Sequence, residues 1–141
     1  MMIDLIAHIA TSNGLADTVS KQALGIVLNG AERQGSPLAE VMFKKIPGAR
    51  VLAARTGVEI GAPTGEIARL IERTPGGRRR VALSMISALQ DAGLDHKAIG
   101  NLLPSIGSWM QSVHGMSDFG HLGDLMSHAD SPVRGEEVRA A

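Results

Sequence analysis

Residues 74–93 have the sequence TPGGRRRVALSMISALQDAG, and this stretch decides the predicted fold. Its second half contains eight apolar residues within three turns, enough to cover well over half of a helix surface. Thr74 is a suitable N-cap, Pro75 suits the first helical position, and Gly93 suits the left-handed residue that follows a last turn. We therefore predict a buried central helix over residues 75–92, with shorter helices packed around it.

The composition favours helices over strands. The chain has 141 residues, the length of one ordinary domain, and 44% of them are hydrophobic. Aromatic residues, which are enriched in strands together with β-branched ones, are limited to Phe43, Trp109 and Phe119. The core must therefore be built from aliphatic side chains and alanine. We predict an all-α protein with a single multihelical domain of seven to nine short helices.

Periodicity and capping residues, among them Ser36 and Asp95, place the other helices along the chain. They are expected at residues 2–12, 17–34, 37–46, 64–73, 96–103, 105–114 and 117–126, with one or two further turns within 49–55. Gly25 and Gly30 lie inside the second of these helices, where each glycine destabilises the helix by about 1 kcal/mol relative to alanine. This cost predicts that another helix passes close by. Pro104 is expected to interrupt or kink the chain. Residues 57–65 contain three glycines and a proline and are predicted to be a loop.

The predicted helical domain covers residues 1–128. Residues 129–141 have neither periodicity nor bulky apolar side chains, so a flexible tail is expected there. No apolar run approaches the roughly 20 residues of a membrane-spanning helix, and the amino terminus lacks the basic region of a secretory signal. A cytoplasmic location is the default expectation. The absence of cysteine excludes disulfides, thiolate metal sites and a cysteine nucleophile.

Charge is concentrated in the middle of the chain. Residues 44–80 hold nine basic and three acidic residues, a net charge of +6, between flanking segments of −2 and −4. This basic segment, Lys44 to Arg80, either lies on solvated faces that help the segments dock or binds an anion or nucleic acid. No aromatic platform and no recognition helix rich in Arg, Asn and Gln accompanies it.

The start of the predicted central helix is the first candidate binding site. Cations are mildly unfavourable at the positive end of a helix dipole, so three arginines there require an explanation. Glycines would let the backbone approach an anion, and arginines would bind phosphate or carboxylate bidentately. The alternative is that Glu66, Glu72 or acids of the carboxy-terminal third neutralise the arginines, or that the helix begins later. The candidate anion- or partner-binding residues are Gly76, Gly77, Arg78, Arg79 and Arg80.

A metal site is weakly indicated near the carboxy terminus. On a continuous helix His121, Asp124 and His128 would share a face, and Asp124 and His128 have the i, i+4 spacing that suits a divalent ion. The two histidines lie about 10 Å apart along such a helix, too far for one ion to be bound by both. We interpret them as the polar side of an amphipathic helix and predict no metal and no cofactor.

Three pieces of the chain together resemble a known group of proteins. They are Gly35-Ser36-Pro37 leading to Ile46-Pro47-Gly48-Ala49, the helix ending in Ala92-Gly93-Leu94, and Leu103-Pro104 followed by an apolar helix. In these the chain resembles the VcgC/VcgE-like bacterial domains of unknown function, and more faintly the YidB-like helical proteins. The resemblance implies an all-helical fold and brings no activity and no functional residues.

The sequence contains no catalytic signature. A nucleophile elbow, a P-loop, a dinucleotide fingerprint and an HExxH motif are all absent. We therefore expect a non-enzymatic interaction or assembly module that forms a homo-oligomer or docks a protein partner. The alternative is an anion- or nucleic-acid-binding domain that uses the basic segment.

Overall fold

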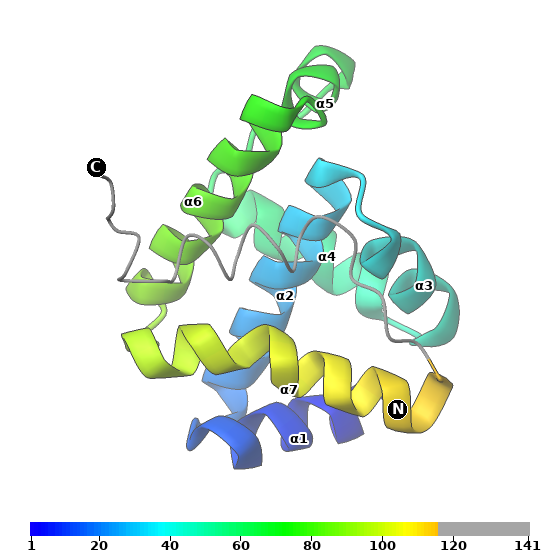
Figure 1. Ribbon diagram of the computed structural model, residues 1–141, viewed down its shortest axis with the longest axis vertical. Coiled ribbons are helices and arrows are strands. Elements are labelled where there is room, and N and C mark those ends of the chain that lie inside the picture. Colours follow the sequence, from blue (N-terminus) through cyan, green and yellow to red (C-terminus); the bar gives the residue numbers. More distant parts are fainter. Residues whose placement is uncertain (116–141) are drawn as a thin grey trace, which may run out of the picture.

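The computed structural model describes residues 1–115, which form seven helices joined by short connections (Figure 1). The helices are α1 (Met2–Asn13), α2 (Asp17–Gln34), α3 (Pro37–Lys45), α4 (Ala49–Glu59), α5 (Glu66–Glu72), α6 (Pro75–Asp91) and α7 (His96–His114). Over this range the predicted all-α fold is confirmed, and no strand is present. The predicted helix at 117–126, the domain boundary at 128 and the tail 129–141 lie outside the described residues.

The central helix is α2, and the prediction that residues 75–92 form it is wrong. Residues 23–31 of α2 are all buried, and α2 contacts α1, α3, α4, α5 and α6. In Figure 1 it passes through the middle of the molecule, with the other helices arranged about it. The core is therefore built around the second helix of the chain.

Helix α6 forms at the predicted place but is amphipathic. Val81, Met85 and Leu89 are buried, whereas Leu83 is 52% exposed. Only one face of α6 lies against α2, so part of its wide apolar surface remains in contact with water. An apolar surface wider than one face is thus compatible with a position at the edge of the core.

Gly25 and Gly30 allow two helices, α4 and α6, to pack closely against α2, as predicted. A Cβ atom on Gly25 would overlap the side chain of Thr56 in α4, and one on Gly30 would overlap the side chain of Met85 in α6. Helix α4 itself extends to Glu59, well beyond the one or two turns predicted. Its contacts with α2 use small residues, which weaken the apolar periodicity that marks a helix in sequence.

Three predicted helix starts are confirmed by backbone N–H groups that donate to the capping side chain. They are Leu38 N to Ser36 Oγ (3.2 Å), Gly77 N to Thr74 Oγ1 (3.0 Å) and Ala98 N to Asp95 Oδ1 (2.8 Å). Helix α7 is continuous through Pro104, where two pieces were predicted. Pro104 lies on the exposed side of α7, so its ring causes no clash with the core.

Candidate functional site

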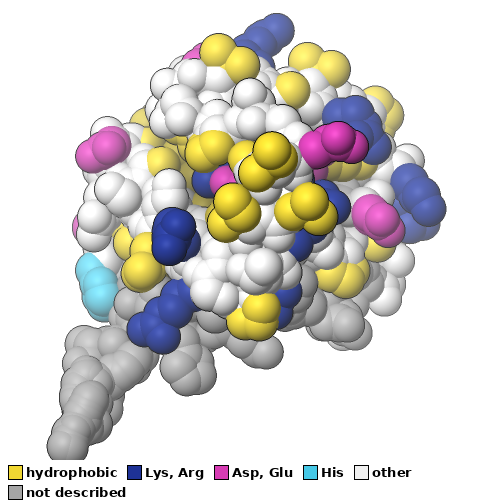
Figure 2. Space-filling model, turned by 90° about the horizontal axis from the view of Figure 1, so that it is seen from above, with side chains coloured by type: hydrophobic (Ala, Val, Ile, Leu, Met, Phe, Trp, Pro, Cys, Tyr) yellow, Lys and Arg dark blue, Asp and Glu magenta, His cyan; other side chains and the backbone are white. Residues whose placement is uncertain are grey.

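The short helix α5 has its apolar face turned outward. Ile67, Leu70 and Ile71 occupy positions i, i+3 and i+4 and are 75%, 72% and 52% exposed, while Glu72 is only 7% exposed. We call these three side chains the α5 stripe. Figure 2 looks down on the end of the molecule that carries α5 and shows apolar side chains gathered near its centre, with basic side chains spaced around them. The apolar residues of the helix predicted at 64–73 have this spacing, but nothing in the sequence indicates that they are exposed.

A buried ion pair holds α5 in this orientation. Glu72 Oε2 accepts hydrogen bonds from Nε (2.9 Å) and Nη2 (2.7 Å) of Arg33 in α2, and Glu72 Oε1 accepts one from Arg69 Nη1 (2.8 Å). The side chains of Arg33 and Glu72 are 5% and 10% exposed. Because a buried charge is tolerated only when it is paired, Glu72 must face α2, and the stripe on the opposite side must face outward.

Sequence reasoning missed this pair. The sequence suggests Glu72 only as a partner for Arg78 to Arg80, and no motif singles out Arg33. A signal was present, because Arg33 lies seven residues after Ile26 and therefore continues the buried stripe of α2. A charge at such a position predicts a buried partner on another helix.

The two glycines of the predicted anion site have different surroundings. A Cβ atom on Gly77 would overlap the carbonyl oxygen of Ile71, whereas one on Gly76 would meet nothing within 4 Å. Gly77 is therefore needed for packing of α5 against α6.

The start of α6 presents few free backbone N–H groups. Thr74 accepts from Gly77 N through its hydroxyl and from Arg78 N through its carbonyl (2.8 Å), and Pro75 has no N–H. A row of amides for an anion is thus not formed, and anion binding by residues 76–80 stays a prediction.

The three arginines at this helix start diverge. The guanidinium of Arg78 donates to the carbonyl of Arg73, Arg79 is exposed, and Arg80 lines a pocket. Within residues 1–115 neither Glu66 nor Glu72 forms an ion pair with any of the three. The suggested neutralisation by these two acids is therefore wrong, because Glu72 is already bound by Arg33 and Arg69.

Other members of the basic segment are engaged locally. The guanidinium of Arg50 lies 4.6 Å from the ring centre of Phe43 and 3.9 Å from Glu32 Oε2. Arg73 donates to the carbonyl oxygen of Glu32 at 3.1 Å. In the view of Figure 2 the Lys and Arg side chains are spread around this end of the molecule, with no single basic stripe.

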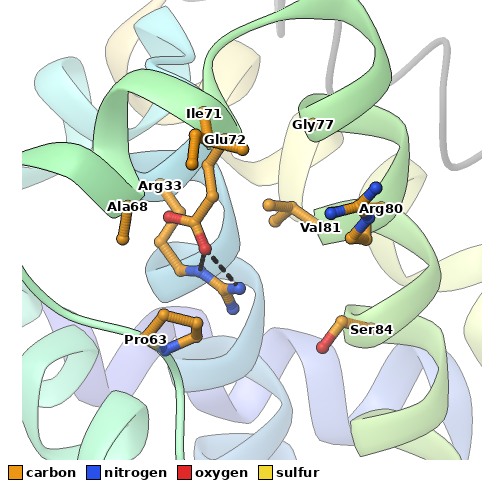
Figure 3. Close-up of a pocket in the computed structure, with 9 residues that line it drawn as sticks. All are labelled: Arg33, Pro63, Ala68, Ile71, Glu72, Gly77, Arg80, Val81 and Ser84. Carbon is orange, nitrogen blue, oxygen red and sulfur yellow. Dashed lines mark hydrogen bonds and ion pairs between the residues drawn. The ribbon is translucent and has the colours of Figure 1, made fainter.

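A pocket of about 380 Å³ lies between α5, α6 and α2. Figure 3 shows the Arg33 side chain extending into it from α2, with Glu72 above from α5 and Ser84 opposite on α6. The lining residues are Arg33, Pro63, Ala68, Ile71, Glu72, Gly77, Arg80, Val81 and Ser84. We call this the Arg33 pocket. A second pocket of about 430 Å³ shares Arg33, Pro63 and Ser84 with it and adds the carboxylates of Glu59 and Asp91.

Residues 1–115 contain no group of three His, Asp or Glu side chains that could bind a metal ion. The weak candidates His121, Asp124 and His128 lie outside the described residues. None of the seven helices has the length and hydropathy needed to cross a bilayer.

No protein-family model, curated protein or solved structure matches this chain. The resemblance to VcgC/VcgE-like and YidB-like proteins therefore stays a prediction, and the functional argument depends on the α5 stripe and the Arg33 pocket.

Proposed function

We propose that this protein is a non-enzymatic interaction module that docks an acidic, amphipathic segment of a partner protein on the α5 stripe. The observation that supports this is the inverted helix, with Ile67, Leu70 and Ile71 exposed and Glu72 buried. Single exposed apolar residues are ordinary, but a contiguous apolar group on one helix face marks an interaction surface.

The spacing of the stripe suits recognition of a protein. Anchors at i, i+3 and i+4 are those that an amphipathic helix lays into an apolar groove. Here the helix is already formed and held by the Arg33–Glu72 pair. Binding would therefore not have to order it, which removes an entropic penalty of association.

The charge around the stripe favours an acidic partner. Residues 66–80 contain five arginines and two glutamates, and one of the two, Glu72, is buried. A second copy that presented the same face would bring two such groups of arginines together, which is unfavourable. A partner with carboxylates flanking its apolar anchors would meet complementary charge.

Nucleic acid fits this surface less well. Phosphate backbones offer no apolar groove for Ile67 and Leu70, and Phe43 is covered by the guanidinium of Arg50 instead of forming an open stacking platform. Nucleic-acid binding through the basic segment remains the alternative and is included as an outcome of the test.

The test is a titration of the full chain with a designed helical peptide that has leucines on one face and glutamates elsewhere. Fluorescence anisotropy would compare wild type with Ile67→Ser/Leu70→Ser and with a control, Val51→Ser, which changes a 61% exposed apolar residue on α4. All these sites are exposed, so each substitution should change the free energy of unfolding by less than about 0.5 kcal/mol. We expect saturable, salt-sensitive binding that the double variant loses and the control keeps.

Three results would contradict the proposal. The first is the absence of saturable peptide binding, or binding that the double variant retains. The second is concentration-dependent dimerisation in sedimentation equilibrium that the double variant abolishes, which would make a second copy the occupant. The third is salt-dependent binding of duplex DNA or RNA without any binding of the peptide. If replacing Arg78, Arg79 and Arg80 with glutamine abolished this nucleic-acid binding, the result would favour the nucleic-acid alternative.

A further inference from the structure

We propose that the Arg33 pocket binds a small organic carboxylate with a compact apolar body. This site lies on the inner side of α5 and shares one residue, Ile71, with the docking surface proposed above. Its volume of about 380 Å³ is near the lower end of the range of ligand pockets.

The hydrogen-bond donor for the carboxylate is the unused edge of the Arg33 guanidinium. Arginine has five N–H groups, and Glu72 Oε2 accepts from only two nitrogens, Nε and Nη2. Within the described residues Nη1 has no hydrogen-bond acceptor, and in Figure 3 the guanidinium extends into the pocket. A buried arginine that is fixed along one edge presents the other edge in the geometry that binds a carboxylate bidentately.

The charge balance of the pocket favours an anion. Both oxygens of Glu72 are occupied, one by Arg33 and the other by Arg69. Arg80 adds a further positive charge to the lining. Within the lining, Arg33 and Arg80 against Glu72 leave one positive charge in excess. The carboxylates of Glu59 and Asp91 line the adjoining pocket instead. The hydroxyl of Ser84, on the α6 wall, is a further donor within the same lining.

The walls select an organic anion over an inorganic one. The apolar surface of the pocket comes from Pro63, Ala68, Ile71 and Val81. If phosphate alone were bound, this surface would stay in contact with water. The small side chain of Ala68 leaves space in the lining between α5 and α6. A short aliphatic chain would fill this space and exclude water from it.

The test uses three probes on the full, ¹⁵N-labelled chain. Hexanoate has both the charge and the apolar body, hexan-1-ol has only the body, and inorganic phosphate has only the charge. Chemical shifts of Arg33 Nε and of the backbone amides of Gly77 and Ser84 would be followed in each titration. We expect saturable binding of hexanoate. Hexan-1-ol should bind more weakly by about tenfold or more, because it lacks the charged hydrogen bond. Phosphate should also bind more weakly by about tenfold or more, because it has no apolar body to fill the pocket.

Matched variants distinguish binding in the pocket from attraction of hexanoate by the general surface charge. Arg80→Gln changes a residue of the lining, and Arg79→Gln makes the same charge change on a neighbour that does not line the pocket; both side chains are exposed. Ala68→Leu fills the apolar space without altering charge. We expect hexanoate affinity to fall about tenfold in the first, to stay unchanged in the second, and to be lost in the third. Ile67→Ser/Leu70→Ser should leave hexanoate binding intact, because neither residue lines the pocket.

The proposal would be overturned by an absence of saturable shifts with hexanoate, or by equal affinity for hexan-1-ol or phosphate. Unchanged hexanoate affinity in both Arg80→Gln and Ala68→Leu would also overturn it. None of these results depends on whether a protein docks on the α5 stripe.

Discussion

Glu72 Oε2 lies 2.7 Å from Arg33 Nη2 across the boundary between α5 and α2, and both side chains are shielded from water. The residues are 39 positions apart in the chain. This contact places a carboxylate where an amphipathic helix would ordinarily place an apolar residue, and so it determines which face of α5 meets solvent.

Removing one partner of this pair should be strongly destabilising. Glu72→Ala leaves the Arg33 charge buried and uncompensated, so we expect a loss of about 3–5 kcal/mol in the free energy of unfolding. The double variant Arg33→Met/Glu72→Met should recover much of that loss, because it leaves no buried charge. Urea unfolding followed by the fluorescence of Trp109 would measure both, and a double variant as unstable as Glu72→Ala would contradict the explanation.

The adjacent glycines at the start of α6 should respond in opposite directions to the same substitution. Gly77→Ala forces a methyl group against the Ile71 carbonyl and should destabilise the protein by roughly 1–3 kcal/mol. Gly76→Ala has open space and should stabilise it by about 0.4–1 kcal/mol through the unfolded chain. Thermal unfolding of the pair is the measurement. Equal effects of the two substitutions on stability would show that the close contact between α5 and α6 is not rigid.

The crossing of α2 and α4 should tolerate no methyl group at Gly25. Because the new Cβ would overlap the hydroxyl of the buried Thr56, Gly25→Ala should cost about 1–3 kcal/mol. Thr56→Ala removes that hydroxyl, so the double variant should be more stable than the sum of the two single changes predicts. A double-mutant cycle in urea measures this coupling, and a coupling energy near zero would argue against the contact.

Pro104 should be replaceable with a gain in stability. It lies inside α7 on the exposed side, where it cannot donate a backbone hydrogen bond to the carbonyl of Gly100. Pro104→Ala restores that donor and should raise the free energy of unfolding by about 1–3 kcal/mol. A fall in the midpoint of thermal unfolding would instead show that the proline is required for packing of α7.

The local signals in the sequence were sufficient to predict most of the helices and the residues at which they start. Ser36, Thr74 and Asp95 cap the helices expected of them because such caps depend only on residues two or three positions away. The close approach at Gly25 was also predictable, because a glycine inside a helix has a known energetic cost.

The identity of the central helix could not be obtained in this way. Helix α2 buries Asn29 and Arg33 because other helices supply partners, namely the Ala53 carbonyl at 3.3 Å and Glu72. Such partners lie 24 and 39 residues away, so the residues next to Asn29 and Arg33 in the sequence do not show which groups these polar side chains contact. The Arg33 pocket and the outward turn of α5 depend on the same distant pairing: the position of Arg33 on the buried side of α2 indicates a buried partner, but not that the partner is Glu72.

The polar attachment of α5 has a consequence for local opening of the protein. The apolar side chains of Ile67 and Leu70 are in water while the helix is docked, so lifting the helix away would uncover little new hydrocarbon surface. Such an opening has a small dependence on urea concentration, because that dependence scales with the surface newly exposed. Amide hydrogens of α5 would then exchange at rates nearly independent of urea, while those of α2 would exchange only with global unfolding.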